Sequence, residues 1–218
     1  MIWTRRRIAI SLAVFLGLLL LGAWPWPAIQ RGFAAIYCPV ANLVIAPQTF
    51  GRGGHARLRP LPQIARGPND NVTADAALAL SVAGYHGDLG IGMSVRRDAY
   101  LPLWILTALL IAVPLPFARR MKALAIGIPL MLALNLAALE LLVTWTFAFQ
   151  LRGIYPADTS VVWKRLVDLA YGAVLTPPGN RFIAPMALGA ALIVWLRETR
   201  AHVALIVTKT SPAVGSSG

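Results

Sequence analysis

The hydrophobic residues of this chain are concentrated in four long runs, separated by short polar and basic segments. The runs cover residues 8–29, 99–118, 123–149 and 182–196. A helix needs about 20 apolar residues to cross the hydrocarbon core of a bilayer. We therefore predict about four transmembrane helices. The second and third would form a hairpin, because only a short basic turn, 119–122, separates them.

The first run resembles a signal peptide at its start, where Arg5, Arg6 and Arg7 precede the apolar residues. No cleavage site of the small-x-small type follows it. The segment 24–27 reads Trp-Pro-Trp-Pro instead, and tryptophan is enriched at membrane interfaces. Residues 1–29 are therefore predicted to be an uncleaved anchor helix.

Short runs of alternating apolar and polar residues lie between the first two predicted spans. Such alternation is typical of half-buried strands, and it occurs at 43–50, 55–61, 72–82 and 88–95. We predict a small antiparallel sheet of three or four strands there. In the loop before the fourth run, residues 161–175 have helical spacing, with Val162, Leu166 and Leu169 on one side. This segment is predicted to be an interfacial helix.

Together these elements predict a membrane all-α helical bundle of about four transmembrane helices with a small antiparallel β-region in the first outer loop, an α+β arrangement. The predicted division of the chain is 1–29 anchor, 30–98 outer β-rich region, 99–149 helical hairpin, 150–181 outer loop with the interfacial helix, 182–200 fourth transmembrane helix and 201–218 cytoplasmic tail, disordered at its end.

Composition supports this assignment. The chain is 58% hydrophobic and 13% charged, with a mean hydropathy of +0.67, which excludes an ordinary soluble fold. Its formal net charge is +12. The basic residues lie between the apolar runs and form no single stripe, which favours anionic lipid headgroups over nucleic acid as the partner of this charge.

The basic residues also predict the orientation, because Lys and Arg near the ends of spans stay on the cytoplasmic side. Nine of them fall on one side of a four-span arrangement, which places both termini in the cytoplasm. They are Arg5, Arg6, Arg7, Arg119, Arg120, Lys122, Arg197, Arg200 and Lys209.

Two strongly polar residues, Asn135 and Glu140, interrupt the third run. Polar groups inside a membrane are costly and face protein or a water-filled cavity. One hypothesis is a proton or ion pathway. The other is structural: Glu140 pairs with a basic loop residue such as Arg152 or Arg181, and Asn135 bonds to a neighbouring helix. The two residues are five positions apart, which places them about 140° apart around a helix. They therefore do not form a single site.

The only cysteine, Cys38, excludes an internal disulfide framework and a cysteine-based zinc site. A nucleophilic role would need a His or Arg to lower its pKa, and His55 and His86 lie in the same outer region. The alternative is a buried small residue. The glycine-rich segment 84–92 lacks the spacing of a phosphate-binding loop, so no cofactor is predicted.

Three stretches and the layout of residues 5 to 197 resemble a known family. The stretches are 97–103 (Arg-Asp-Ala-Tyr-Leu-Pro-Leu), 114–120 with its Pro-Leu-Pro and Arg119-Arg120, and 177–185 with its Pro-Pro-Gly-Asn-Arg-Phe and Pro185. The chain is similar to the small membrane proteins that accompany bacterial exosortases, enzymes thought to sort envelope proteins carrying a C-terminal tripartite signal.

The resemblance implies an accessory role in a Gram-negative inner membrane, a periplasmic location for the β-rich region and an exosortase-like membrane partner. It implies no catalysis. Exosortases carry a membrane-associated Cys with Arg and His on other spans, and Cys38 has no such partners within the predicted spans. The competing hypothesis is a small membrane enzyme or transporter that uses Glu140 and Asn135, with Cys38 as a further candidate. A sensor with its sheet outside is a third.

Overall fold

The computed structural model describes residues 5–24, 26–51, 53–66, 73–82, 89–151, 160–175 and 179–196. Its elements follow one another as α1 (Arg5–Ala23), α2 (Pro27–Ile45), β1 (Gly54–Arg66), β2 (Thr73–Val82), β3 (Leu89–Met93), η1 (Arg96–Tyr100), α3 (Leu101–Ala112), α4 (Phe117–Trp145), η2 (Thr146–Gln150), α5 (Val161–Leu175) and η3 (Gly179–Ile183). The last apolar helix, here called the final helix, is Arg181–Leu196.

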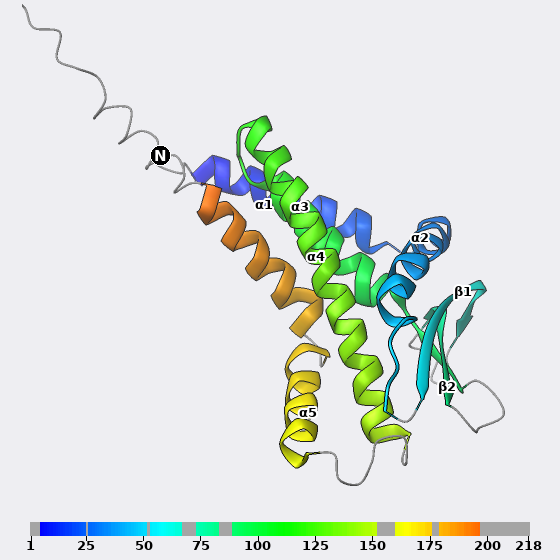
Figure 1. Ribbon diagram of the computed structural model, residues 1–218. Helices are drawn as coiled ribbons and strands as arrows, with labels where there is room; N and C mark the ends of the chain where they lie inside the picture. The colour runs from blue at the N-terminus through cyan, green and yellow to red at the C-terminus, as the bar shows by residue number, and fades with distance from the viewer. Residues whose placement is uncertain are drawn as a thin grey trace, which may run out of the picture.

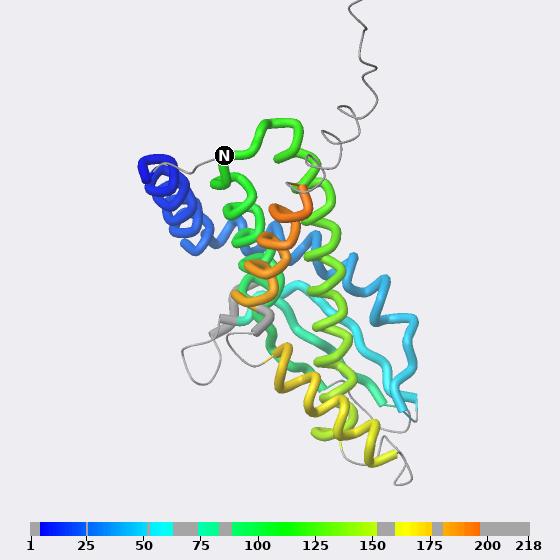
Figure 2. The backbone as a smooth tube through the Cα atoms, turned by 90° about the vertical axis from the view of Figure 1, so that its left-hand side faces the viewer, coloured from blue at the N-terminus to red at the C-terminus, as the bar shows by residue number. Residues whose placement is uncertain are grey.

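The long helix α4 is the centre of the molecule (Figure 1). α3 forms a hairpin with it, and α1 packs on α3. α5 and the final helix follow one another along another side of α4, and α2 and the sheet lie near its C-terminal end (Figures 1 and 2). The fold is thus a helical bundle with the sheet attached at one end.

Three helices among the described residues are long and apolar enough to cross a membrane. They are α1, α2 and the continuous helix Phe117–Gln150. The chain is therefore a membrane-embedded protein. Long apolar helices occupy the positions of the first and third predicted spans, although α1 ends at Ala23, before the predicted end at residue 29. The predicted second and fourth spans are also helical, but α3 has 12 residues and the final helix falls in the shorter class.

The helix α2 corrects the prediction for the start of the outer region. A strand was expected over 43–50, but residues 43–45 are the last turn of α2, which begins at Pro27. Proline at a first helical position is a helix-start signal. The buried residues of α2 recur every three or four positions, as a helix face requires; they are Gln30, Ala34, Tyr37, Cys38, Ala41 and Ile45.

The sheet confirms the antiparallel prediction with three strands in the order β1-β2-β3. The predicted segments 55–61, 72–82 and 88–95 correspond to β1, β2 and β3. Leu58 of β1 pairs with Leu78 of β2, and Leu78 pairs with Ile91 of β3. Leu58 and Leu78 are buried in one apolar core with residues of α2 and α4, so the sheet packs on these helices.

A second apolar core lies in the bundle, away from the sheet. It contains Leu106 and Leu110 of α3, Ala123 and Met131 of α4, and Leu192 and Leu196 of the final helix. Close approach in this bundle depends on small residues: a Cβ atom added at Gly127 of α4 would lie 2.9 Å from Leu192. α4 therefore joins two cores, one in the bundle and one under the sheet.

Candidate functional site

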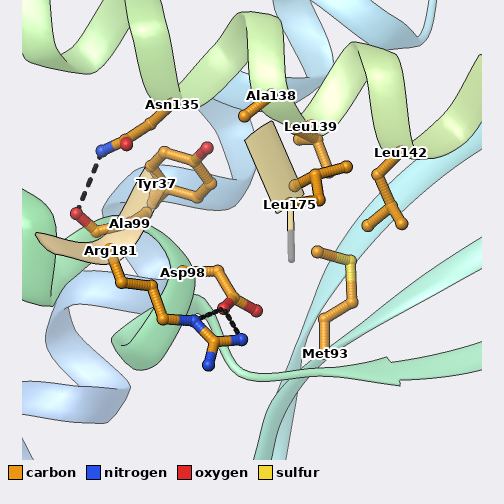
Figure 3. A pocket seen from close by; sticks show the side chains of 10 residues that line it. All are labelled: Tyr37, Met93, Asp98, Ala99, Asn135, Ala138, Leu139, Leu142, Leu175 and Arg181. Carbon is orange, nitrogen blue, oxygen red and sulfur yellow. Dashed lines mark hydrogen bonds and ion pairs between the residues drawn. The ribbon is translucent and has the colours of Figure 1, made fainter. Parts of the chain in front are cut away.

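A small cavity beside the core under the sheet is lined by four polar and six apolar residues (Figure 3). We call it the polar cavity; its volume is ≈ 50 Å³. Side chains from helices, the sheet and the π-helical segments η1 and η3 meet there. The lining residues are Tyr37, Met93, Asp98, Ala99, Asn135, Ala138, Leu139, Leu142, Leu175 and Arg181.

The turn from β3 into η1 is fixed by Asp75 of β2, which is 3% exposed. Its carboxylate accepts hydrogen bonds from the backbone N–H groups of Val95 at 2.6 Å and Arg96 at 2.9 Å. It therefore caps the start of the helix that continues as α3, where free N–H groups favour a negative charge. Burial nevertheless raises the pKa of Asp75 above its ordinary value, and these N–H bonds offset only part of the shift.

Asp98 lies one turn beyond this cap and binds two arginines through one oxygen, Oδ1. The Arg181 Nη2 donates to it at 3.0 Å and Nε at 3.2 Å, and the Arg97 Nε donates at 3.1 Å. The Asp98 and Arg181 side chains are 32% and 23% exposed. The pair joins η1 to η3 at the mouth of the polar cavity, and the second oxygen of Asp98 points away from Arg181 (Figure 3).

Asn135 of α4 forms another wall of the polar cavity and is 3% exposed. Its Nδ2 donates to the carbonyl oxygen of Ala99 at 3.0 Å. Its Oδ1 is buried and has no hydrogen-bond partner in the described part of the chain. A buried acceptor without a partner costs about 1–3 kcal/mol, so this oxygen is a position where a ligand with a donor group would be stabilised.

The structure thus brings two of the four predicted site residues, Asn135 and Arg181, to one cavity. Glu140 does not line it, and Arg181 pairs with Asp98 in place of Glu140. Glu140 is half-buried and forms no ion pair with any described residue. The other suggested partner, Arg152, lies outside the described residues. Asn135 does bond to a neighbouring element, as the structural hypothesis required.

Cys38 is fully buried in the core between α2 and the sheet. It lines a shallow groove with Arg57 and Arg59 of β1, but none of its own surface is exposed. His55 is exposed on β1, and His86 lies outside the described residues. Within the described ranges, no group of three His, Cys, Asp or Glu residues could hold a metal ion. Cys38 thus occupies a packed position in this core.

Sequence reasoning missed Asp98 and Tyr37 as parts of this site. Asp98 directly precedes an apolar run and is next to Arg97. An acid beside a base at the boundary of such a run indicates an ion pair. No comparable feature of the sequence indicates a role for Tyr37. It reaches the polar cavity only because α2 is a helix, which places it on the same buried face as Ala34 and Ala41.

The two edges of the sheet differ. On the outer side of β1, the Asn42 side chain of α2 accepts a hydrogen bond from the Leu58 N–H and donates one to the Leu58 carbonyl, both at 2.8 Å. On the outer side of β3, no further strand is formed by the described residues. Gly90 and Gly92 of β3 are exposed. Within the described ranges, one edge therefore has a side chain bonded to its backbone, and the other has no neighbouring strand.

Comparison with known proteins gives no relative for this arrangement: no family model, no curated protein and no solved structure matches the chain.

Proposed function

We propose that this protein is a non-enzymatic accessory protein of a bacterial inner membrane that docks to a larger membrane partner through the open edge of β3. The resemblance to exosortase-associated proteins supplies the class of partner, an envelope protein-sorting enzyme of the exosortase type. The observation that carries the docking proposal is the unpaired backbone of β3.

The hydrogen-bond pattern of the sheet determines which groups of β3 are free. Because the N–H and carbonyl of Leu58 bond to Asn42, Leu58 and Leu78 form a non-hydrogen-bonded pair. The backbone groups of Leu78 then point to Ile91. Gly90 and Gly92, the neighbours of Ile91, therefore point their N–H and carbonyl groups outward, where an added strand would bind them.

The charges support the orientation that places this edge in the periplasm. The start of α1, the α3–α4 turn and the end of the final helix lie at one end of the molecule, and the sheet and α5 lie toward the other (Figures 1 and 2). The first end carries Arg5, Arg6, Arg7, Arg119, Arg120 and Lys122. We assign it to the cytoplasm, because positive charge marks the cytoplasmic ends of spans.

Helix length supports a position for Glu140 at the opposite interface. The rise from residue 120 to residue 140 is about 30 Å, which equals the thickness of the hydrocarbon core. The large apolar side chains exposed on α4 lie before this point, the last being Leu134. The rest of α4 extends beyond the bilayer as a support for the sheet. Glu140 is then at headgroup level, where a charge needs no partner inside the membrane.

We place α2 at the outer membrane surface, although its length would allow it to span. α2 runs away from α1 toward the sheet (Figures 1 and 2) and packs on β1 and β2. Its other side exposes Ile29, Ile36 and Leu43, which would enter the interface between lipid tails and headgroups. Reporter fusions after Val95, Lys122, Thr176 and Thr210 should therefore report outside, inside, outside and inside. A cytoplasmic signal at Val95 would overturn the orientation.

The docking proposal is tested with two substitutions at one position. Gly90→Pro removes an outward N–H and leaves the bonds of β3 to β2 intact, whereas Gly90→Ala keeps the N–H, and an added Cβ there meets no atom within 4 Å. Copurification with a co-expressed exosortase from the same genome should be lost in Gly90→Pro and retained in Gly90→Ala. Equal copurification of both variants would contradict docking at this edge.

The alternative function is a small membrane enzyme or transporter that uses Glu140 and Asn135. The unpaired oxygen of Asn135 in the polar cavity favours it, and the separation of Glu140 from that cavity opposes it. Glu140→Gln distinguishes the two functions. An accessory protein should retain assembly and phenotype in this variant, and loss of function at unchanged abundance would favour the alternative.

A further inference from the structure

An apolar groove runs beside the polar cavity on the surface of the bundle. Its volume is ≈ 360 Å³, and α4, the end of α5 and the start of the final helix form its walls. The lining residues are Leu134, Ala137, Ala138, Leu141, Ala173, Val174, Ile183 and Ala184. Ala138 lines both the groove and the polar cavity, so the two lie side by side.

We propose that the groove and the polar cavity together bind one membrane phospholipid whose headgroup carries a primary amine. An acyl chain lies in the groove, the ammonium enters the polar cavity and the phosphate meets Arg181 and Arg97. Residues 134–142 of α4, which line the groove and the polar cavity, lie about 21–33 Å along the helix from residue 120, which is the level of the outer interface in the orientation proposed above.

The need for a hydrogen-bond donor in the ligand comes from Asn135. Its Oδ1 is a buried acceptor without a partner among the described residues, and its Nδ2 is already bonded to Ala99. A primary ammonium supplies three N–H donors. A cavity of ≈ 50 Å³ holds groups of the size of a few water molecules, which matches an ammonium group.

Charge complementarity favours a zwitterionic headgroup. Two cations, Arg97 and Arg181, flank one anion, Asp98, and all three side chains are partly exposed. Asp98 and Arg181 line the polar cavity. A phosphate beside the arginines and an ammonium beside Asp98 and Asn135 would each meet the opposite charge or an acceptor. Arginine is well suited to phosphate, because its planar guanidinium offers several donors at once.

The test compares two phospholipids with the same acyl chains, phosphatidylethanolamine and phosphatidylcholine. The second carries three methyl groups on its nitrogen and no N–H donor. The full chain is reconstituted in nanodiscs with equal amounts of both, released in mild detergent, and its retained lipids are counted by native mass spectrometry. We expect roughly a five- to tenfold enrichment of phosphatidylethanolamine over its share in the bilayer, the ratio that one net hydrogen bond supplies.

Three variants locate the site. Asn135→Leu should abolish the preference between the two lipids. Ala137→Phe should abolish retention, because Ala137 is exposed and lines the groove. Ala133→Phe is the matched control: Ala133 is also exposed, one turn earlier on α4, and does not line the groove, so wild-type retention is expected. Equal retention of both lipids by the wild type, or a preference that survives in Asn135→Leu and Ala137→Phe, would overturn the proposal.

Discussion

The Asn42 side chain closes the outer edge of β1 by bonding to both backbone groups of Leu58. Its amide oxygen and nitrogen each lie 2.8 Å from the atoms that they bind. This carboxamide acts as a one-residue substitute for a neighbouring strand. It also joins α2 to the sheet, and it leaves β3 as the edge on which another chain could add a strand.

The first prediction concerns this contact. Asn42→Leu should lower the free energy of unfolding by about 2 kcal/mol, because two backbone groups of Leu58 lose their partners. Asn42→Asp keeps the acceptor but sets a carboxylate oxygen against the Leu58 carbonyl, so it should also destabilise the protein. Chemical unfolding in detergent micelles measures both. Equal stability of the wild type and Asn42→Leu would show that water replaces the side chain at this edge.

The second prediction concerns the contact between α1 and α3. Gly22 lies against the indole of Trp104, which an added Cβ would overlap, and the Trp104 Nε1 donates to the carbonyl of Leu18 at 2.7 Å. Gly22→Ala should destabilise the protein by about 1–3 kcal/mol through overpacking.

Gly17 on the same helix provides the control, since an added Cβ there meets no atom within 4 Å. Gly17→Ala should be neutral or stabilising by up to about 1 kcal/mol, because alanine favours the helix. Thermal unfolding in detergent compares the two variants. A loss of stability of the same size at both positions would argue against close packing of α1 on α3.

The third prediction concerns the ion pair of Asp98 and Arg181. Both side chains are partly exposed, so solvent screening limits their coupling to about 1 kcal/mol. A double-mutant cycle with Asp98→Asn and Arg181→Gln should give a coupling of that size, decreasing with added salt. The cycle with Arg97→Gln should give a smaller value, because the Arg97 side chain is 38% exposed. Additive effects in the first cycle would mean that the contact contributes no stability.

The fourth prediction is a pH dependence from Asp75, whose pKa burial raises above the ordinary value of 3.8. A group with a raised pKa binds its proton more tightly in the folded protein than in the unfolded chain. Its contribution to stability is therefore complete below the ordinary pKa and is lost as the pH rises through the pKa of the folded state.

The measurement is the midpoint of thermal unfolding from acid to neutral pH, for the wild type and Asp75→Asn. The variant should be less stable at acid pH, because one amide oxygen cannot accept two N–H groups as well as the two oxygens of the carboxyl group do, and the difference should decrease as the pH rises. It should also lack the part of the wild-type slope that Asp75 causes. Identical slopes in the two proteins would assign the pH dependence to other groups.

Much of the fold follows from local patterns. The runs that form α1 and α4 are apolar over a length that only a helix in a membrane or a core uses, and the alternation in 72–82 corresponds to β2. α2 was missed because Gly32 and Pro39 lie inside it and because the apolar residues at its end also fit alternation. Its helical state depends on burial of one face against the sheet, and that burial is a tertiary effect.

The candidate site could be predicted only in part, for a related reason. The presence of Asn135 within an apolar run signals a polar contact whatever the fold is. The partner of Arg181 is not signalled in this way: Asp98 is 83 positions away, and Glu140 and Asp98 are both acids near the ends of apolar runs. The choice between them depends on which helix faces η3, and that depends on the packing of the bundle.

The sequence by itself determined that this protein is membrane-embedded, that a small antiparallel sheet lies between its first two apolar runs, and which end of the molecule carries the positive charge. Each of these properties depends on the hydropathy, alternation or charge of a short segment, so it can be predicted without knowing which segments contact one another. Only the tertiary structure decided that Asn135, Asp98 and Arg181 share one cavity, that Cys38 is buried and that β3 has no neighbouring described strand on its outer side. These properties depend on contacts between residues far apart in the chain, and such contacts form only when the helices and the sheet pack together.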